Sequence, residues 1–125
     1  MHHGETKMQI ALVQWWAQVW RELGAPAEEV LFHVPNGGAR DPRGAAILKA
    51  MGLRRGLPDI FLALPIHPFA GMVLELKAPR GRLSIEQKRM CIILSAAGFK
   101  WCAPRDLETA QARIREFLAG KAIAG

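Results

Sequence analysis

The apolar residues of the first segment recur every three or four positions from Met8 to Leu23, and Gly24 and Pro26 follow them. This spacing predicts an amphipathic helix over residues 5–23. Three tryptophans share its apolar stripe. A place in the protein core or in a subunit interface therefore explains them better than stacking on nucleic-acid bases.

Short apolar runs later in the chain predict β-strands. Residues 59–64 and 72–77 are apolar enough to form central strands that are covered on both faces, with residues 65–70 as the connecting loop. Outer strands are predicted over residues 30–34 and 99–103.

Three further helices are expected, and each has a recognisable start or end. Asp41 is a candidate N-cap before Pro42, and Gly98 ends the next helix. The predicted spans are residues 41–51, 85–97 and 107–118. The chain length of 125 residues and the alternation of helices and strands predict one α/β domain over residues 1–125.

The composition points to a globular protein with an anionic partner. Half of the residues are hydrophobic and 22% are charged, which excludes a disordered chain, and the apolar runs are too short to span a membrane. The 17 Lys and Arg residues outnumber the 11 Asp and Glu residues, which gives a net charge of +6. Nucleic acid is the first candidate partner, but charge alone does not decide this, so motifs must.

Cysteine usage and the N-terminus bear on the cellular environment. Cys91 and Cys102 are the only cysteines, and they lack the spacing of a disulfide framework or a structural zinc site. The first residues lack the basic flank and apolar run of a signal peptide. We therefore expect a reducing, cytoplasmic location.

Two charged residues interrupt the second central strand. Glu75 and Lys77 are two positions apart, so they face the same side of a strand. If the two central strands form a hairpin whose loop centres near residues 67 and 68, Asp59 lies opposite Glu75 or Lys77 and on the same face. A register shifted by one residue would separate Asp59 from the other two.

This combination has a chemical explanation and a structural one. Two carboxylates can hold Mg²⁺ or Mn²⁺, hard cations that prefer oxygen ligands, and a lysine beside them can position or deprotonate a water molecule. Together they would hydrolyse a phosphodiester. The structural alternative is an ordinary ion pair at the sheet surface, which a short pattern of this kind usually represents.

Four short motifs follow one another along the chain, namely residues 34–38 (VPNGG), 56–59 (GLPD), 75–79 (ELKAP) and 81–84 (GRLS), and Gln87 comes after them. In this order they resemble the virus-type replication-repair nuclease (VRR-NUC) domain of the PD-(D/E)xK nuclease superfamily. The similarity extends over nearly the whole chain. It implies a restriction-endonuclease-like core of helix, three strands, helix and strand, with a mixed central sheet flanked by helices.

The resemblance also implies roles for individual residues. Asp59 and Glu75 correspond to the metal-binding acids and Lys77 to the catalytic lysine. Glu5 is the best match for an acid that family members bring from the first helix, although favourable placement at a helix N-terminus explains it equally well. Gln87 corresponds to a glutamine near the catalytic site, but Ser84 and Gln87 also form a capping-box pattern, so a structural role is an equal alternative.

Other polar residues surround the expected site in sequence. Arginines and lysines at such positions would contact phosphates, and an Asn-Gly-Gly segment would either let the backbone approach DNA or form a turn. The candidate DNA-binding residues are Asn36, Arg40, Arg43, Arg54, Arg55, Arg80, Arg82, Lys88 and Arg89.

The resulting hypothesis is a divalent-metal-dependent DNA endonuclease with Mg²⁺ or Mn²⁺ as cofactor. The resemblance implies a 5′-phosphate product and selectivity for branched DNA such as Holliday junctions, in a bacterial or phage-infected cell. A homodimer or higher homo-oligomer is expected, with the aromatic first helix as a candidate interface. The alternatives are a non-catalytic DNA-binding module with the same fold and a sequence-specific restriction-type nuclease.

Overall fold

The computed structural model describes residues 3–35 and 41–120. In these residues a four-stranded sheet has the spatial order β1 (Leu31–His33), β2 (Ile60–Leu62), β3 (Gly71–Leu74) and β4 (Phe99–Cys102). The β1–β2 and β2–β3 pairs are antiparallel and the β3–β4 pair is parallel. The mixed α/β architecture predicted from the sequence is therefore confirmed.

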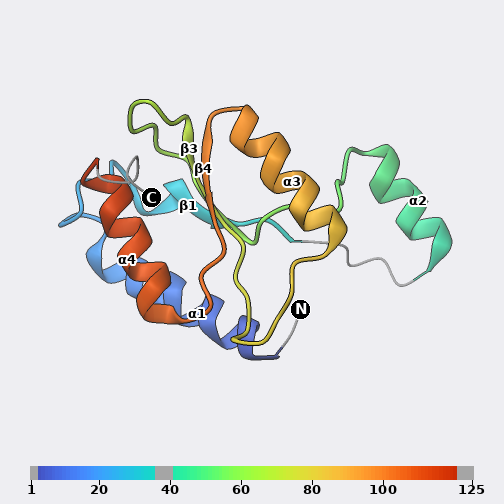
Figure 1. Cartoon of the computed structure of the whole chain (residues 1–125), viewed down its shortest axis with the longest axis horizontal. Helices are drawn as coiled ribbons and strands as arrows, with labels where there is room; N and C mark the ends of the chain where they lie inside the picture. The colour runs from blue at the N-terminus through green and yellow to red at the C-terminus, as the bar shows by residue number, and fades with distance from the viewer. Residues whose placement is uncertain (1–2, 36–40, 121–125) are drawn as a thin grey trace.

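Helices cover the sheet unequally. Helices α1 (His3–Val19) and α4 (Leu107–Leu118) pack on one face, whereas α3 (Ile85–Ala96) lies on the other side, next to β4 (Figure 1). A single 3-10 turn, η1 (Glu28–Val30), precedes β1. No helix in the described part of the chain is both long and apolar enough to cross a membrane.

The core lies between the sheet and the α1–α4 pair. Alternate strand residues point into it, as the pleat of a strand requires. Its most deeply buried apolar side chains are Leu12, Trp16, Ile60, Leu62, Met72, Leu74, Leu76, Ile114 and Phe117.

The tryptophans of α1 belong to this core. Trp16 is 1% exposed and its indole N–H donates a hydrogen bond of 2.8 Å to the carbonyl oxygen of Glu28, while Trp15 and Trp20 pack against the buried cluster. The core explanation of these residues is confirmed. Their packing inside the chain covers part of the aromatic face expected as a candidate dimer interface, and that interface stays a prediction.

The opposite face of the sheet carries a row of phenylalanines. Phe32, Phe61 and Phe99 come from three different strands, with ring centroids 5.9 Å apart for the first pair and 6.2 Å apart for the second. Phe32 remains 43% exposed, because α3 lies near β4 and does not reach this edge of the sheet.

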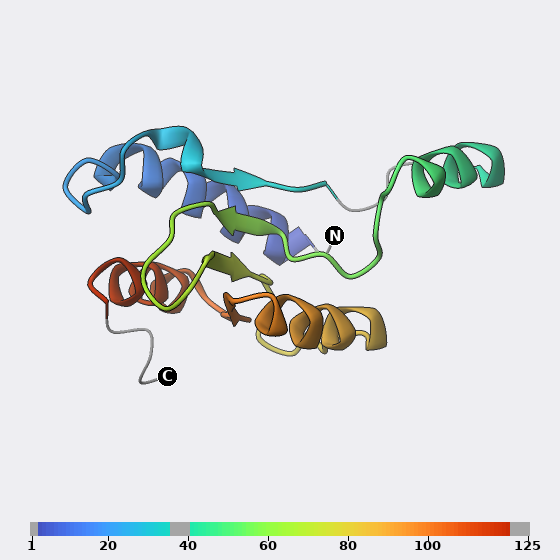
Figure 2. The same cartoon turned by 90° about the horizontal axis from the view of Figure 1, so that it is seen from above.

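Helix α2 (Pro42–Ala50) projects from the body of the molecule (Figure 2). The predicted start is confirmed: Asp41 accepts a hydrogen bond of 2.7 Å from the backbone N–H of Gly44, and Pro42 occupies the first turn. None of the residues of this helix is buried. The helix therefore lies outside the hydrophobic core.

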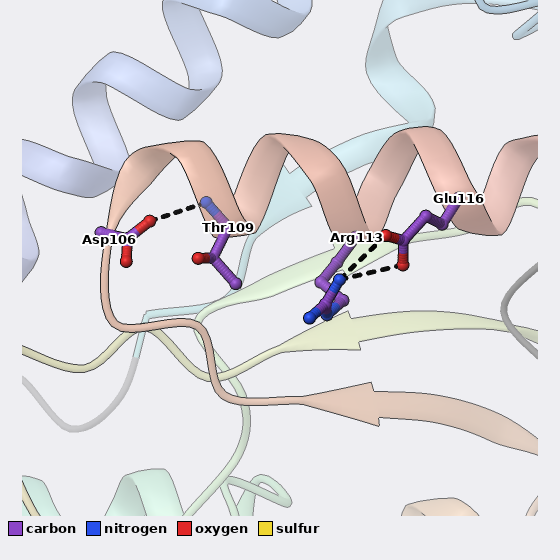
Figure 3. A network of polar contacts seen from close by, with 4 residues as sticks. All are labelled: Asp106, Thr109, Arg113 and Glu116. Carbon is purple, nitrogen blue, oxygen red and sulfur yellow. Dashed lines mark hydrogen bonds and ion pairs between the residues drawn. The ribbon is translucent and has the colours of Figure 1, made fainter. Parts of the chain in front are cut away.

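The start of α4 is fixed by a similar cap. Asp106 accepts a hydrogen bond of 2.7 Å from the backbone N–H of Thr109, and this bonding lowers the pKa of Asp106 (Figure 3). Further along the same helix, Arg113 and Glu116 form an exposed ion pair at 2.9 Å. The cap makes Asp106, which directly follows Arg105, the last residue before the helix.

The central strands are shorter than predicted. We expected strands over residues 59–64 and 72–77, but β2 ends at Leu62 and β3 at Leu74. Beyond that point the backbone N–H of Glu75 still donates to Cys102 and that of Lys77 to Pro104. The segment of Glu75 and Lys77 thus keeps the hydrogen bonds on its β4 side while the pairing with β2 has ended.

Candidate active site

The hairpin register places Asp59 and Glu75 opposite each other. Ile60 pairs with Leu74, and the same register extended by one residue brings Asp59 to Glu75. This is one of the two registers considered from the sequence. Asp59 is 7% exposed, Glu75 2% and Lys77 8%, so three ionisable side chains are buried together at one end of the sheet.

Three hydrogen bonds from two segments fix the position of Asp59. Its carboxylate accepts a hydrogen bond of 2.8 Å from the backbone N–H of Leu76. Its carbonyl oxygen accepts from the backbone N–H of Val34 at 3.1 Å and from Nδ1 of His33 at 2.7 Å. His33 therefore has a structural role, and the Asp59 side chain is tied directly to the segment that carries Glu75.

Glu75 has an unusual electrostatic environment. Burial, the side-chain contact with Asp59 and the negative charge of Asp59 together raise the pKa of Glu75 to about 9, while the Lys77 ammonium opposes this rise and Glu5 adds to it. One oxygen of Glu75, Oε1, is buried and has no hydrogen-bond partner in the described residues. An orphan buried oxygen of this kind is costly unless a proton or a cation accompanies it.

These features fit a hard divalent cation. The donor atoms are carboxylate oxygens, which Mg²⁺ and Mn²⁺ prefer, and a positive ion would relieve the repulsion that raises the pKa of Glu75. Across residues 3–35 and 41–120, however, no three His, Cys, Asp or Glu side chains gather into a complete metal site. The pair Asp59 and Glu75 would thus supply the protein ligands, and water or phosphate oxygens would complete the shell, as is usual for Mg²⁺.

Glu5 lies at the margin of this pair. Its carboxylate accepts a hydrogen bond of 3.2 Å from the backbone N–H of Ala78, and its charge is near enough to raise the pKa of Glu75. It also lies in the first turn of α1, where a negative charge is favourable. The contact ties the start of α1 to the segment that carries Glu75, and a role for Glu5 as a metal ligand stays a prediction.

Gln87 makes the capping box that the sequence suggested as one alternative. Its side-chain oxygen accepts from the backbone N–H of Ser84 at 2.8 Å, and the Ser84 hydroxyl accepts from the backbone N–H of Gln87 at 3.1 Å. The amide oxygen of Gln87 takes part in the capping box, whereas its NH₂ group does not. A catalytic contribution from that group stays a prediction.

Several basic side chains border a groove whose lining also includes Gln87. The groove, about 1150 Å³ in volume, separates α2 from the start of α3 and is lined in part by Lys49, Arg54 and Arg55. Lys49 was not among the sequence candidates, because only the structure shows which face of α2 borders the groove. The candidates Asn36 and Arg40 lie outside the described residues. The others are exposed, namely Arg43, Arg54, Arg55, Arg80, Arg82, Lys88 and Arg89.

A glycine sets one wall of this groove. Gly56 has a φ of +79°, and a Cβ atom at this position would collide with the backbone of Glu86. The chain that carries Arg54 and Arg55 can therefore approach the start of α3 only because residue 56 has no side chain.

Arg105 is a residue near the site that the sequence analysis missed. Its guanidinium donates to the carbonyl oxygens of Ala78, Pro79 and Gly81, in the loop that follows Lys77. No motif includes this arginine, and the contact depends on the parallel packing of β4 against β3, so no signal in the sequence indicates it.

The raised pKa of Glu75 generates a stability prediction. Because this pKa is about 9 in the folded chain against an ordinary value of 4.5, the folded state binds the proton more tightly between these values. The stability of the metal-free protein should therefore fall as pH rises through this window. Glu75→Gln cannot titrate, so its Tm relative to wild type should rise steadily with pH when both are measured in EDTA. A difference in Tm that stays constant across the window would contradict the environment described for Glu75.

Comparisons with known proteins add information about the fold. No protein-family model and no curated protein matches this sequence. One solved structure, described as a VRR_NUC domain protein, superimposes with a TM-score of 0.79 at 20% sequence identity, covering 93% of this chain and 88% of the other. The protein thus has the fold of a VRR_NUC domain protein, with a buried Asp59–Glu75 pair beside Lys77 at one end of its sheet.

Proposed function

We propose that this protein is a nuclease of the VRR-NUC family that hydrolyses DNA phosphodiester bonds with Mg²⁺ or Mn²⁺. The observation that carries the proposal is the contact between two buried carboxylates, Asp59 and Glu75, beside the buried ammonium of Lys77. A structural ion pair needs one carboxylate and one cation. The second carboxylate makes the site electrostatically unfavourable by itself and suited to a divalent ion.

Each residue has a distinct task in this mechanism. Asp59 and Glu75 would hold the ion, and the bond from Leu76 N–H keeps Asp59 turned towards Glu75. When bound, the ion supplies charge stabilisation for the phosphate and lowers the pKa of a water molecule. Lys77 orients the attacking water and balances the charge that develops on the phosphate oxygens. In-line attack of this water on phosphorus would break the bond to the 3′ oxygen, which takes up a proton and leaves as a 3′-hydroxyl, so that the other product carries a 5′-phosphate.

The DNA would follow the basic surface. Arg54 and Arg55 lie on the groove between α2 and α3, and the segment that carries them leads to Asp59. Phosphate contacts of this type position the duplex without reading its sequence. Because such a short chain has little surface for base readout, we favour selectivity for branched DNA over recognition of a fixed sequence. The expected location is the cytoplasm of a bacterial or phage-infected cell.

Two alternatives remain distinct from this proposal. A non-catalytic DNA-binding module would have no need of the buried carboxylate pair. A restriction-type nuclease would cut plain duplex DNA at fixed sites and give discrete plasmid fragments.

The first prediction concerns cleavage. We expect wild-type protein to cut a labelled four-way junction faster than duplex or single-stranded DNA, with Mg²⁺ or Mn²⁺ and not with EDTA. Lys77→Ala should lower the rate by about 10²-fold or more while DNA binding is retained, because Lys77 acts on charge that develops during the reaction. Tight binding without cleavage by the wild type under every condition would support the DNA-binding module instead.

The second prediction concerns the basic groove. Replacing Arg54 and Arg55 with alanine should weaken duplex binding and reduce the slope of log K against log salt by about 1.8, since each phosphate contact contributes about 0.9. Arg113→Ala, on the far helix α4, serves as the matched control and should leave the slope unchanged. An unchanged slope in the double variant would exclude these arginines from the DNA interface.

The third prediction concerns assembly, because symmetric cutting of a junction is simplest with two copies of the site. Exposed apolar side chains gather on α3, including Ile92 at 71% and Ile93 at 42% exposed. Light scattering after size exclusion should give about twice the chain mass of 13.8 kDa. Ile92→Asp should yield monomer, whereas Ile10→Asp on α1 should not. A wild-type mass of one chain at all concentrations would contradict the dimer.

A further inference from the structure

Arg105 connects three parts of the molecule at the edge of the candidate site. It follows the buried Pro104 at the end of the β4 segment and precedes Asp106, the N-cap of α4. Its Nη1 donates to the carbonyl oxygens of Ala78 at 3.2 Å, Pro79 at 3.3 Å and Gly81 at 2.5 Å. One cationic group therefore holds most of the turn that links β3 to α3, with charge-assisted bonds that are stronger than neutral ones.

This turn lies against the side chain of Lys77. Gly81 donates a backbone hydrogen bond of 2.9 Å to Ala78, which folds the turn back towards the strand. A Cβ atom built on Gly81 would lie 3.4 Å from Cδ of Lys77 and 3.2 Å from the carbonyl oxygen of Ala78. The turn thus comes near enough to the methylene chain that carries the ammonium for one added carbon atom to touch it.

The backbone of Lys77 is held from the same side. Its N–H donates to the carbonyl oxygen of Pro104 at 3.1 Å, one residue before Arg105. The segment of Pro104 and Arg105 consequently acts on Lys77 in two ways, through a direct backbone bond and through the turn that lies next to its side chain.

We propose that Arg105 is a positioning residue that sets the place of the Lys77 ammonium through the turn of residues 78–81. A lysine side chain has four flexible carbon–carbon bonds, so its ammonium keeps a defined position only if its stem is packed. A displacement of about 1 Å at a reacting group can cost about 10²-fold in rate. The effect on rate rests on the proposed nuclease function, whereas the effect on Lys77 itself does not.

A competing explanation is that Arg105 binds a DNA phosphate directly, because its side chain is exposed. The two explanations differ in what they change. Loss of a phosphate contact weakens DNA binding and lowers the salt slope by about 0.9. Loss of a positioning contact lowers kcat and leaves KM and the salt slope unchanged.

The test follows the NMR signal of the Lys77 Cε methylene in protein without metal or DNA, identified by its absence in Lys77→Arg. Arg105→Ala should shift this signal, Arg105→Lys should shift it less, and Arg113→Ala should leave it in place. Gly81→Ala adds a methyl group close to Cδ of Lys77 and should shift the signal as well. In cleavage assays Arg105→Ala should lower kcat by about 10-fold with KM within about 2-fold of wild type.

A Lys77 signal that stays unchanged in both Arg105→Ala and Gly81→Ala would overturn the proposal, as would a rise in KM accompanied by a reduced salt slope and an unchanged kcat. If the wild type cuts no DNA but the signal moves as expected, the positioning role holds and the nuclease function fails. Circular dichroism of each variant confirms that the fold is intact.

Discussion

Asp59 and Glu75 bring two carboxylates into contact where water hardly reaches them, and the raised pKa of Glu75 reflects the electrostatic cost of that arrangement. A protein interior normally avoids such a pair, because desolvation and like-charge repulsion act in the same direction. Lys77 relieves the repulsion only in part. The surrounding structure must therefore hold the pair in place.

The sheet and its flanking segments provide this support. The β2–β3 hairpin sets the two acids opposite each other, and the N–H of Leu76 binds the Asp59 carboxylate. The parallel β4 segment then holds the chain that carries Glu75 and Lys77 after its pairing with β2 has ended. Glu5 on α1 and Arg105 before α4 close the arrangement by binding the turn beyond Lys77. Elements distant in sequence thus converge on one short segment.

Much of this could be predicted from local signals in the sequence. The caps at Asp41 and Ser84 mark helix starts that the structure confirms, and the symmetry of a hairpin limits Asp59 to two possible partners. The remainder depends on tertiary packing. The early end of the β2–β3 pairing and the three hydrogen bonds from Arg105 to carbonyl groups both arise from contacts between different segments, which no local sequence pattern indicates.

The central claim is that the Asp59–Glu75 pair binds a divalent cation in place of a proton, and calorimetric titration of the metal-free protein with Mn²⁺ at neutral pH tests it most directly. Because the pKa of Glu75 is about 9, repeating the titration in buffers of different ionisation enthalpy should show release of about one proton for each ion bound. Binding should be lost in Asp59→Asn. Mn²⁺ binding with no proton release, or with undiminished affinity in Asp59→Asn, would contradict the account.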